Sequence, residues 1–315
     1  MGQLGETVQG GARVPRCVWC GGPARPAGGR LAVCAGCGAA STFPPPDDAE
    51  LERAYAGAYR PASGRFAAGG DRLLRRTRAT LARRLDLRAP PGPILDVGCG
   101  DGALLCALQA RGRRALGLER DADLARASSA VRPIELLDFH ELEGQWAAVV
   151  FWHSLEHLRA PRAALRHACR LLAPGGLLVV AMPNRSSWQA RCLGERWLAL
   201  DLPRHLVHLP AATLRAGVEE CGLRIERVSH WRGGQVVFGW LHGLVAALPG
   251  GPDLYDAIRR PEARAAPMGA RRRALALSAG LALAPLAGAL AAAEVAAGAG
   301  GSVYLEARRP ARARD

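Results

Sequence analysis

Residues 94–102 read ILDVGCGDG and decide the fold of this chain. The ILDV segment suits a buried strand, and the ALLCALQARG segment that follows at 103–112 suits a helix. Gly98, Gly100 and Gly102 allow a tight turn between the two and a close approach of the backbone to a ligand, which then lies at the positive end of the helix. The pattern predicts a cofactor-binding loop, although a G-x-G-x-G loop alone would suit a nucleotide-binding oxidoreductase equally well.

Strands and helices alternate on both sides of this loop. Continuous apolar strands separated by helices predict an α/β fold whose mostly parallel sheet is covered on both faces. The strand candidates are 94–97, 114–119, 134–137, 147–152, 177–182, 223–231 and 302–308, and the helix candidates are 103–111, 122–130, 161–172 and 211–221.

Two further positions fit a nucleotide-like cofactor. The second strand ends in Glu119, about twenty residues after the loop, where a carboxylate can accept hydrogen bonds from both ribose hydroxyls. Arg120 follows it in GLERD, and the third strand ends in LLDF, which places Asp138 and Phe139 near the adenine. Cys99 lies inside the loop as a small packing residue that lines the cofactor.

Four cysteines near the N-terminus have the spacing C-x2-C-x13-C-x2-C, formed by Cys17, Cys20, Cys34 and Cys37. Two such pairs suit tetrahedral thiolate coordination of a structural zinc ion, and redox thiols or a decayed site are the alternatives. We expect residues 1–16 to be disordered, 17–46 to form a zinc ribbon, 47–92 to be a helical linker ending in a docking helix, and 93–315 to form the main domain.

An insertion at 232–300 interrupts the alternation within that domain. It contains twenty uncharged residues, 274–293, preceded by Arg271, Arg272 and Arg273. Alanine-rich composition and Pro285 favour a helical hairpin that packs on the domain or lies on a membrane surface through 271–293 over a true membrane span.

The overall charge is strongly basic, with 42 basic and 28 acidic residues and a formal net charge of +14. Such a charge is compatible with nucleic acid or an anionic membrane, but every basic residue among the 42 is an arginine, as biased base composition would produce. The N-terminus carries no signal-peptide pattern and the other five cysteines are scattered, so we expect a cytoplasmic protein with reduced thiols.

The segments ILDVGCGDG, GLERD, SLEHL and LLAPGGLLVVAMPN, in that order and spacing, resemble class I S-adenosylmethionine-dependent methyltransferases over 94–231 and 302–308. The CAGCG, FPPP, paired Tyr55 and Tyr59, and RWLALDLPRHLVHLPAATLRAGVEECG segments resemble a bacterial group of that superfamily. The resemblance implies a Rossmann-like seven-stranded sheet whose last strand is antiparallel and inserted beside the sixth. It also implies S-adenosylmethionine as cofactor, with Asp96 toward its methionine amino group. Trp146-Ala147 departs from the usual Phe-Asp before the fourth strand.

Candidate catalytic residues form two groups. His153, Glu156 and His157 follow the fourth strand in FWHSLEHL, in the loop that faces the methyl group in the resembled fold, so His153 is also expected to touch the cofactor. The H-x-x-E-H spacing is similar to the E-x-x-E-H arrangement with which some quinone-pathway O-methyltransferases bind a divalent cation, but His153 replaces the first carboxylate. His205 and His208, beside Arg204, form the second group, and local structural roles are the alternative for both groups.

The leading hypothesis is methylation, on oxygen or carbon, of a small-molecule acceptor such as a sugar, a glycolipid or another envelope or secondary metabolite. The basic flank and apolar insertion would suit a lipid-linked acceptor and a peripheral position at the inner face of the membrane. A ribosomal or transfer RNA methyltransferase is the second hypothesis, but the basic residues are not interleaved with aromatic ones, so we do not expect a nucleic-acid partner. An inactive cofactor-binding scaffold is the third.

Overall fold

The computed structural model describes residues 6–9, 12–56, 64–66, 69–120, 131–133, 138–231 and 234–311, with the backbone alone for 6–14 and 131–139. Its centre is a seven-stranded sheet in the order β12-β13-β10-β9-β6-β7-β8. The strands are β6 (Ile94–Val97), β7 (Ala115–Glu119), β8 (Val131–Pro133), β9 (Trp146–Trp152), β10 (Leu172–Pro183), β12 (Arg224–Ser229) and β13 (Ser302–Arg308).

The direction of the strands confirms the Rossmann-like α/β class. β9 is parallel to β6 and β10, whereas β13 is antiparallel to both β10 and β12 and lies between them. The third strand, expected at 134–137, is instead β8 at Val131–Pro133, and 134–137 lie outside the described residues. The helix expected at 122–130 also lies outside them.

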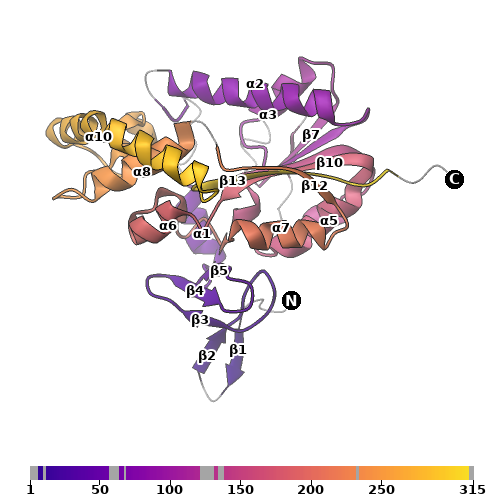
Figure 1. Ribbon diagram of the computed structural model, residues 1–315, viewed down its shortest axis with the longest axis horizontal. Helices are drawn as coiled ribbons and strands as arrows, with labels where there is room; N and C mark the ends of the chain where they lie inside the picture. The colour runs from indigo at the N-terminus through magenta and orange to yellow at the C-terminus, as the bar shows by residue number, and fades with distance from the viewer. Residues whose placement is uncertain are drawn as a thin grey trace.

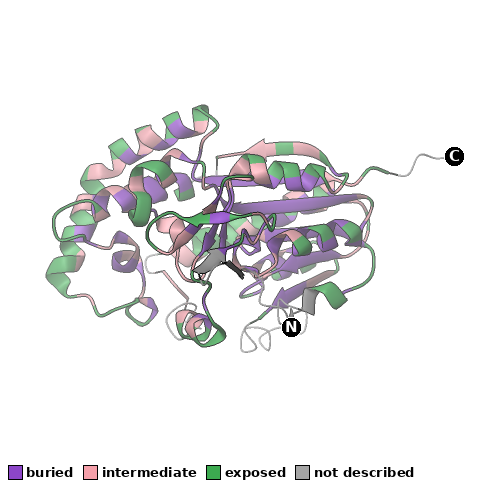
Figure 2. Cartoon of the chain, turned by 90° about the horizontal axis from the view of Figure 1, so that it is seen from below, coloured by how far each residue is buried: buried purple, intermediate pink, exposed green. Residues whose placement is uncertain are grey.

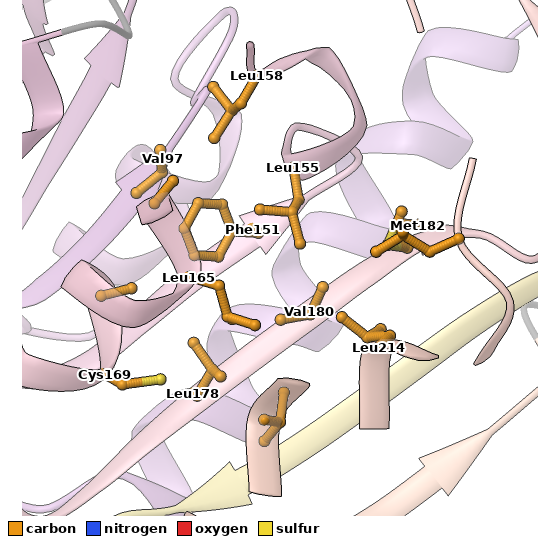
Figure 3. Packing of buried hydrophobic residues seen from close by; sticks show 14 of the residues in the cluster. Val97, Phe151, Leu155, Leu158, Leu165, Cys169, Leu178, Val180, Met182 and Leu214 are labelled. Carbon is orange, nitrogen blue, oxygen red and sulfur yellow. The ribbon is translucent and has the colours of Figure 1, made fainter. Parts of the chain in front are cut away.

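Helices cover both faces of this sheet, as Figure 1 shows. On one side lie α2 (Gly70–Arg88) and α3 (Ala103–Gln109), and on the other α5 (Pro161–Leu171) and α7 (Ala211–Glu219). A buried hydrophobic cluster lies on each face of the sheet. Successive residues of β9 point to opposite faces, so Val149 packs in one cluster and Val150 in the other. Phe151, Leu165 and Val180 meet in the first of these clusters (Figure 3).

The insertion folds as a helical unit at one end of the sheet (Figure 1). It consists of α8 (Gly234–Ala246), α9 (Leu254–Ile258), a short 3₁₀ turn (Pro261–Ala263) and α10 (Ala270–Ala296). Ala287 and Ala291 of α10 pack with Val236 and Trp240 of α8. Figure 2 shows that much of the outer surface of this unit is exposed, in contrast to the buried strands of the sheet. α10 is long and apolar enough to cross a membrane, by length and composition only.

The N-terminal ribbon forms a separate small sheet. Its strands are β3 (Ala24–Pro26), β4 (Leu31–Cys34) and β5 (Ala40–Thr42), with β11 (Val207–His208) as a fourth strand beside β5. Within the segment 1–16, which the sequence predicts to be disordered, β1 (Glu6–Gln9) and β2 (Ala12–Pro15) pair as an antiparallel hairpin. Backbone pairing between these strands is a long-range feature that the polar, Gly-rich composition does not reveal.

The remaining helices connect these units. Asp47 caps α1 (Asp48–Tyr55), which leads from the ribbon toward the sheet, and Ser187 caps α6 (Trp188–Leu193). Short 3₁₀ turns lie at Asp138–Glu141, Leu155–His157, Gly194–Arg196 and Leu198–Leu200.

Candidate active site

The glycine loop after β6 is attached to β7 by backbone hydrogen bonds. The amides of Gly98 and Cys99 both donate to the Leu118 carbonyl, at 2.8 and 3.0 Å. Gly98, Gly100 and Gly102 all have positive φ, of 77°, 59° and 71°, a region in which side chains are strained. A Cβ atom at Gly98 would lie 2.5 Å from Cβ of Ser154, so the loop packs directly against the segment that follows β9.

Glu119 ends β7 and turns its buried carboxylate toward the loop. One oxygen accepts from the Gly100 amide at 2.8 Å and the other from the Arg120 amide at 2.9 Å. The Arg120 guanidinium lies 4.7 Å from the centre of the Tyr55 ring. Asp96 is buried at the end of β6, and Cys99 is buried against β7, where its side chain fills the space left by Gly117.

The side chains of Asp138 and Phe139 lie outside the described part of the chain. Their predicted place near the adenine therefore stays a prediction.

His153 follows β9 in a left-handed conformation, with φ 54°, that non-glycine residues rarely adopt. Its amide donates to the Ala181 carbonyl at 2.7 Å. Its Nδ1 lies 3.3 Å from a carboxylate oxygen of Glu156, and its Nε2 lies 3.3 Å from the amide nitrogen of Gln235 in α8. Burial raises the pKa of Glu156 to about 7, against the opposing charge of His205.

The second group of histidines lies beside the first. The His157 and His205 rings are 4.7 Å apart, and Nε2 of His205 lies 4.0 Å from the Glu156 carboxylate and 3.7 Å from that of Asp201. Nδ1 of His157 lies 2.8 Å from the Tyr55 hydroxyl. The structure thus brings His153, Glu156, His157 and His205 into one cluster.

His208 lies at the margin of this cluster. Its ring centre is 6.1 Å from that of His205, and its side chain is buried. Burial lowers the pKa of His208 to about 3, with a smaller contribution from the charge of His205, which makes it a weak base.

Two sets of described side chains place ligand atoms within 4.8 Å of one another, close enough for one metal ion. The first is Cys17, Cys20, Cys34 and Cys37, whose sulfurs approach pairwise at 3.5 Å between Cys17 and Cys37 and between Cys20 and Cys34. Four converging sulfurs suit tetrahedral zinc. The second is Glu156, His157 and His205.

The sequence alone does not indicate that Asp201 and Gln235 lie beside this cluster, or that Tyr55 contacts His157. The sequence indicates Tyr55 only through a resemblance, because its contact with His157 joins positions 102 residues apart. Gln235 lies in the insertion, and no local pattern indicates that α8 begins beside His153. Asp201 forms an ion pair with Arg204 and could have been suspected from the charge spacing alone.

Comparison with known proteins shows which family this chain resembles. A family model described as a methyltransferase domain matches residues 67–228, slightly more than half of the 315 residues. The ubiquinone biosynthesis O-methyltransferase of Xanthomonas oryzae pv. oryzae (strain PXO99A) is 29% identical over 167 residues, which cover 47% of this chain and 69% of that protein. The enzyme of the same name from Bordetella avium (strain 197N) is 30% identical over 154 residues, covering 42% and 64%.

Solved structures include a SAM dependent methyltransferase from Archaeoglobus fulgidus, with a TM-score of 0.47 and 14% identity over 74% of this chain and 94% of that one. The matched residues include the glycine loop, Glu119 and the four residues His153, Glu156, His157 and His205. The chain therefore belongs to the methyltransferase-domain family and is an S-adenosylmethionine-dependent methyltransferase.

Proposed function

We propose that this enzyme methylates an oxygen atom of a small-molecule acceptor, with His153 as the general base. The observation that carries the proposal is the pair formed by His153 and buried Glu156, directly after β9 and beside the glycine loop that Ser154 contacts. The names of the relatives, ubiquinone biosynthesis O-methyltransferases, support oxygen over carbon as the methylated atom.

The residues around the loop fit the cofactor. Glu119 would accept hydrogen bonds from the ribose hydroxyls, Asp96 would face the methionine amino group, and the backbone of 98–102 would line the remainder. A bound S-adenosylmethionine supplies an electrophilic methyl group on a sulfonium.

We also propose that the four cysteines hold a structural zinc ion, because a closed set of four thiolates leaves no position for a substrate.

The geometry around His153 suits proton removal. Nε2 of His153 would accept the proton of the acceptor hydroxyl as the oxygen–methyl bond forms, and Glu156 beside Nδ1 would stabilise the imidazolium that results. The Gln235 amide, 3.3 Å from Nε2, would be displaced by the acceptor hydroxyl or move to hydrogen-bond it. A divalent cation on Glu156, His157 and His205 is the alternative use of these side chains.

The acceptor is proposed to be lipid-linked and presented at the inner face of the membrane. Supporting this, α10 carries Arg271, Arg272 and Arg273 at its start and exposes Leu275, Leu281 and Leu286. We further propose that the chain belongs to the bacterial methyltransferase group with an N-terminal ribbon.

The first test is S-adenosylmethionine binding by titration calorimetry, comparing wild type with Glu119→Ala. We expect wild-type binding and a loss of about 10- to 100-fold or more in the variant, since each hydrogen bond to a charged group contributes about 1.5–3 kcal/mol. Glu143→Ala, at an exposed position, is the control. Absence of binding by folded wild-type protein would contradict the proposed cofactor site.

A second test identifies the acceptor class and the base. Cell extract is incubated with enzyme and S-adenosylmethionine labelled in the methyl group, and label is counted in lipid, small-molecule and RNA fractions. We expect label in the lipid or small-molecule fraction, and a fall of about 100-fold or more for His153→Gln with unchanged cofactor affinity. Label in RNA would favour the RNA methyltransferase hypothesis, and label in no fraction would favour the scaffold.

A further inference from the structure

The strand that carries His208 belongs to the sheet of the four-cysteine ribbon. Val207 of β11 pairs with Ser41 and His208 pairs with Ala40, both in β5. In Figure 1 the ribbon lies below the main sheet, with β5 at its upper edge. The ribbon sheet therefore extends into the segment that supplies the second group of histidines.

Thr42 makes the closest connection between the ribbon and that segment. Its hydroxyl donates to the His205 carbonyl at 2.6 Å in a buried hydrogen bond, across 163 residues of sequence. Its amide donates to the Leu206 carbonyl at 3.1 Å, and the Leu206 amide donates to the Glu156 carbonyl at 2.8 Å. The backbone at 205–206 is thus held between the ribbon and the loop that carries Glu156.

The cysteines, in turn, shape β5. The Cys34 amide donates to the Ala39 carbonyl at 2.9 Å, and the Cys34 carbonyl accepts from Gly38 at 2.9 Å. These bonds form the turn that leads from Cys34 and Cys37 into β5. A change in the geometry of the cysteines would therefore be transmitted to Thr42 through a strand of only three residues, Ala40–Thr42.

A second contact attaches the ribbon to the main domain away from the histidines. Trp19 packs against Gly217 of α7, where an added Cβ atom would lie 2.5 Å from the indole. The Thr213 hydroxyl of the same helix donates to the Cys37 carbonyl at 2.6 Å. Like the Thr42 hydrogen bond, the Thr213 hydrogen bond runs from a threonine hydroxyl to a backbone carbonyl and is 2.6 Å long, but it does not involve His205.

We infer that Thr42 is a positioning residue for His205, and that metal binding by the four cysteines fixes the acceptor side of the active site. The inference rests on the proposed function, because it assumes zinc in the ribbon and a role for His205 beside Glu156. The glycine loop is held separately, by the bonds of Gly98 and Cys99 to Leu118 in β7. We therefore expect a change in the ribbon to leave cofactor affinity unchanged.

The test compares full-length Thr42→Val with Thr42→Ser and with Thr213→Val, all at confirmed zinc content. Hydrogen–deuterium exchange is followed in the segment 205–208 and in the glycine loop 94–102. We expect about tenfold faster exchange at 205–208 in Thr42→Val, since a buried hydrogen bond is lost, and wild-type exchange in the glycine loop. Thr42→Ser restores slow exchange, and Thr213→Val leaves 205–208 unchanged.

A spectroscopic readout separates positioning from general destabilisation. The ring proton resonance of His205 is expected to shift in Thr42→Val and return in Thr42→Ser, while that of His167, whose Nε2 lies 3.0 Å from the Leu142 carbonyl oxygen, stays fixed. Removal of zinc from wild type with a chelator should reproduce the Thr42→Val pattern at 205–208 with unchanged S-adenosylmethionine affinity.

Three results would overturn the inference: wild-type exchange at 205–208 in Thr42→Val, the same change in Thr213→Val, or loss of protection in both segments together. None of them depends on the acceptor. Failure of the proposed function would appear instead as absent cofactor binding in the wild type.

Discussion

His208 is a buried imidazole, 2% exposed, whose ring nitrogens have no hydrogen-bond partner within the described residues. Burial holds its pKa near 3 in the folded protein, below the value of about 6.5 expected when unfolded. The unfolded chain therefore binds a proton at His208 that the folded chain does not. Its contribution to stability is full above about pH 6.5 and is lost as the pH falls toward 3.

Replacing His208 with leucine should remove this dependence. Between pH 7.5 and pH 5 we expect the wild type to lose about 2 kcal/mol more unfolding free energy than His208→Leu, measured by urea denaturation. The comparison uses the difference between pH values, so a constant effect of the substitution cancels. Equal pH dependence in the two proteins would mean that folding does not lower the pKa of His208.

Buried Glu294 ties the insertion to the main domain. Its carboxylate accepts hydrogen bonds from the Gln189 amide at 2.8 Å, from the Gln189 side chain at 3.0 Å and from the Trp240 indole at 3.0 Å. These three donors come from α6 and α8, so one side chain of α10 joins three helices. The place of α8 beside His153 depends on this junction.

We expect Glu294→Ala to destabilise the protein by about 3–5 kcal/mol, because three buried donors lose a charged acceptor. Glu294→Gln, which keeps one acceptor oxygen, should cost less. Thermal unfolding measures both, and Glu219→Ala at an exposed position is the control. A loss for Glu294→Ala no larger than that of the control would show that the donors find other partners.

The elements predicted from sequence were those fixed by local pattern. β6, α3, β9, α5, α7 and β13 lie where apolar periodicity and the glycine loop placed them, within a few residues. β11 was missed because a two-residue strand has no periodicity, and its partner is the distant β5. His153, Glu156, His157 and His205 were candidates from sequence in two separate groups. Their approach into one cluster, and the contacts of Tyr55 and Gln235 with it, depend on long-range packing that no local pattern shows.

Binding to a membrane surface concerns the chain as a whole, because it combines a charge of +14 with the exposed leucines of the insertion. Leu275 and Leu286 of α10 are 53% and 48% exposed. They are about three helical turns apart and so share one face of α10. That face and the arginines 271–273 would contact anionic lipid together.

Flotation with vesicles of phosphatidylcholine, with and without phosphatidylglycerol, tests this proposal. We expect binding only with phosphatidylglycerol, reduced about tenfold or more by joint Leu275→Gln and Leu286→Gln substitution. Leu73→Gln with Leu87→Gln, at exposed positions of α2, is the matched control. Binding lost equally in both double variants, or no binding at all, would refute a specific role for α10.

The position of β13 has a consequence for biosynthesis. β13 pairs with both β10 and β12, so it covers one edge of β10 and connects β12 to the sheet. The ribosome makes β13 after the ribbon, the six other strands of this sheet and the insertion. Until then the nascent chain presents an open edge of the apolar strand β10 and an unpaired β12, which are sites of aggregation. Chaperone capture of the emerging polypeptide should therefore persist until residues 302–308 have left the exit tunnel.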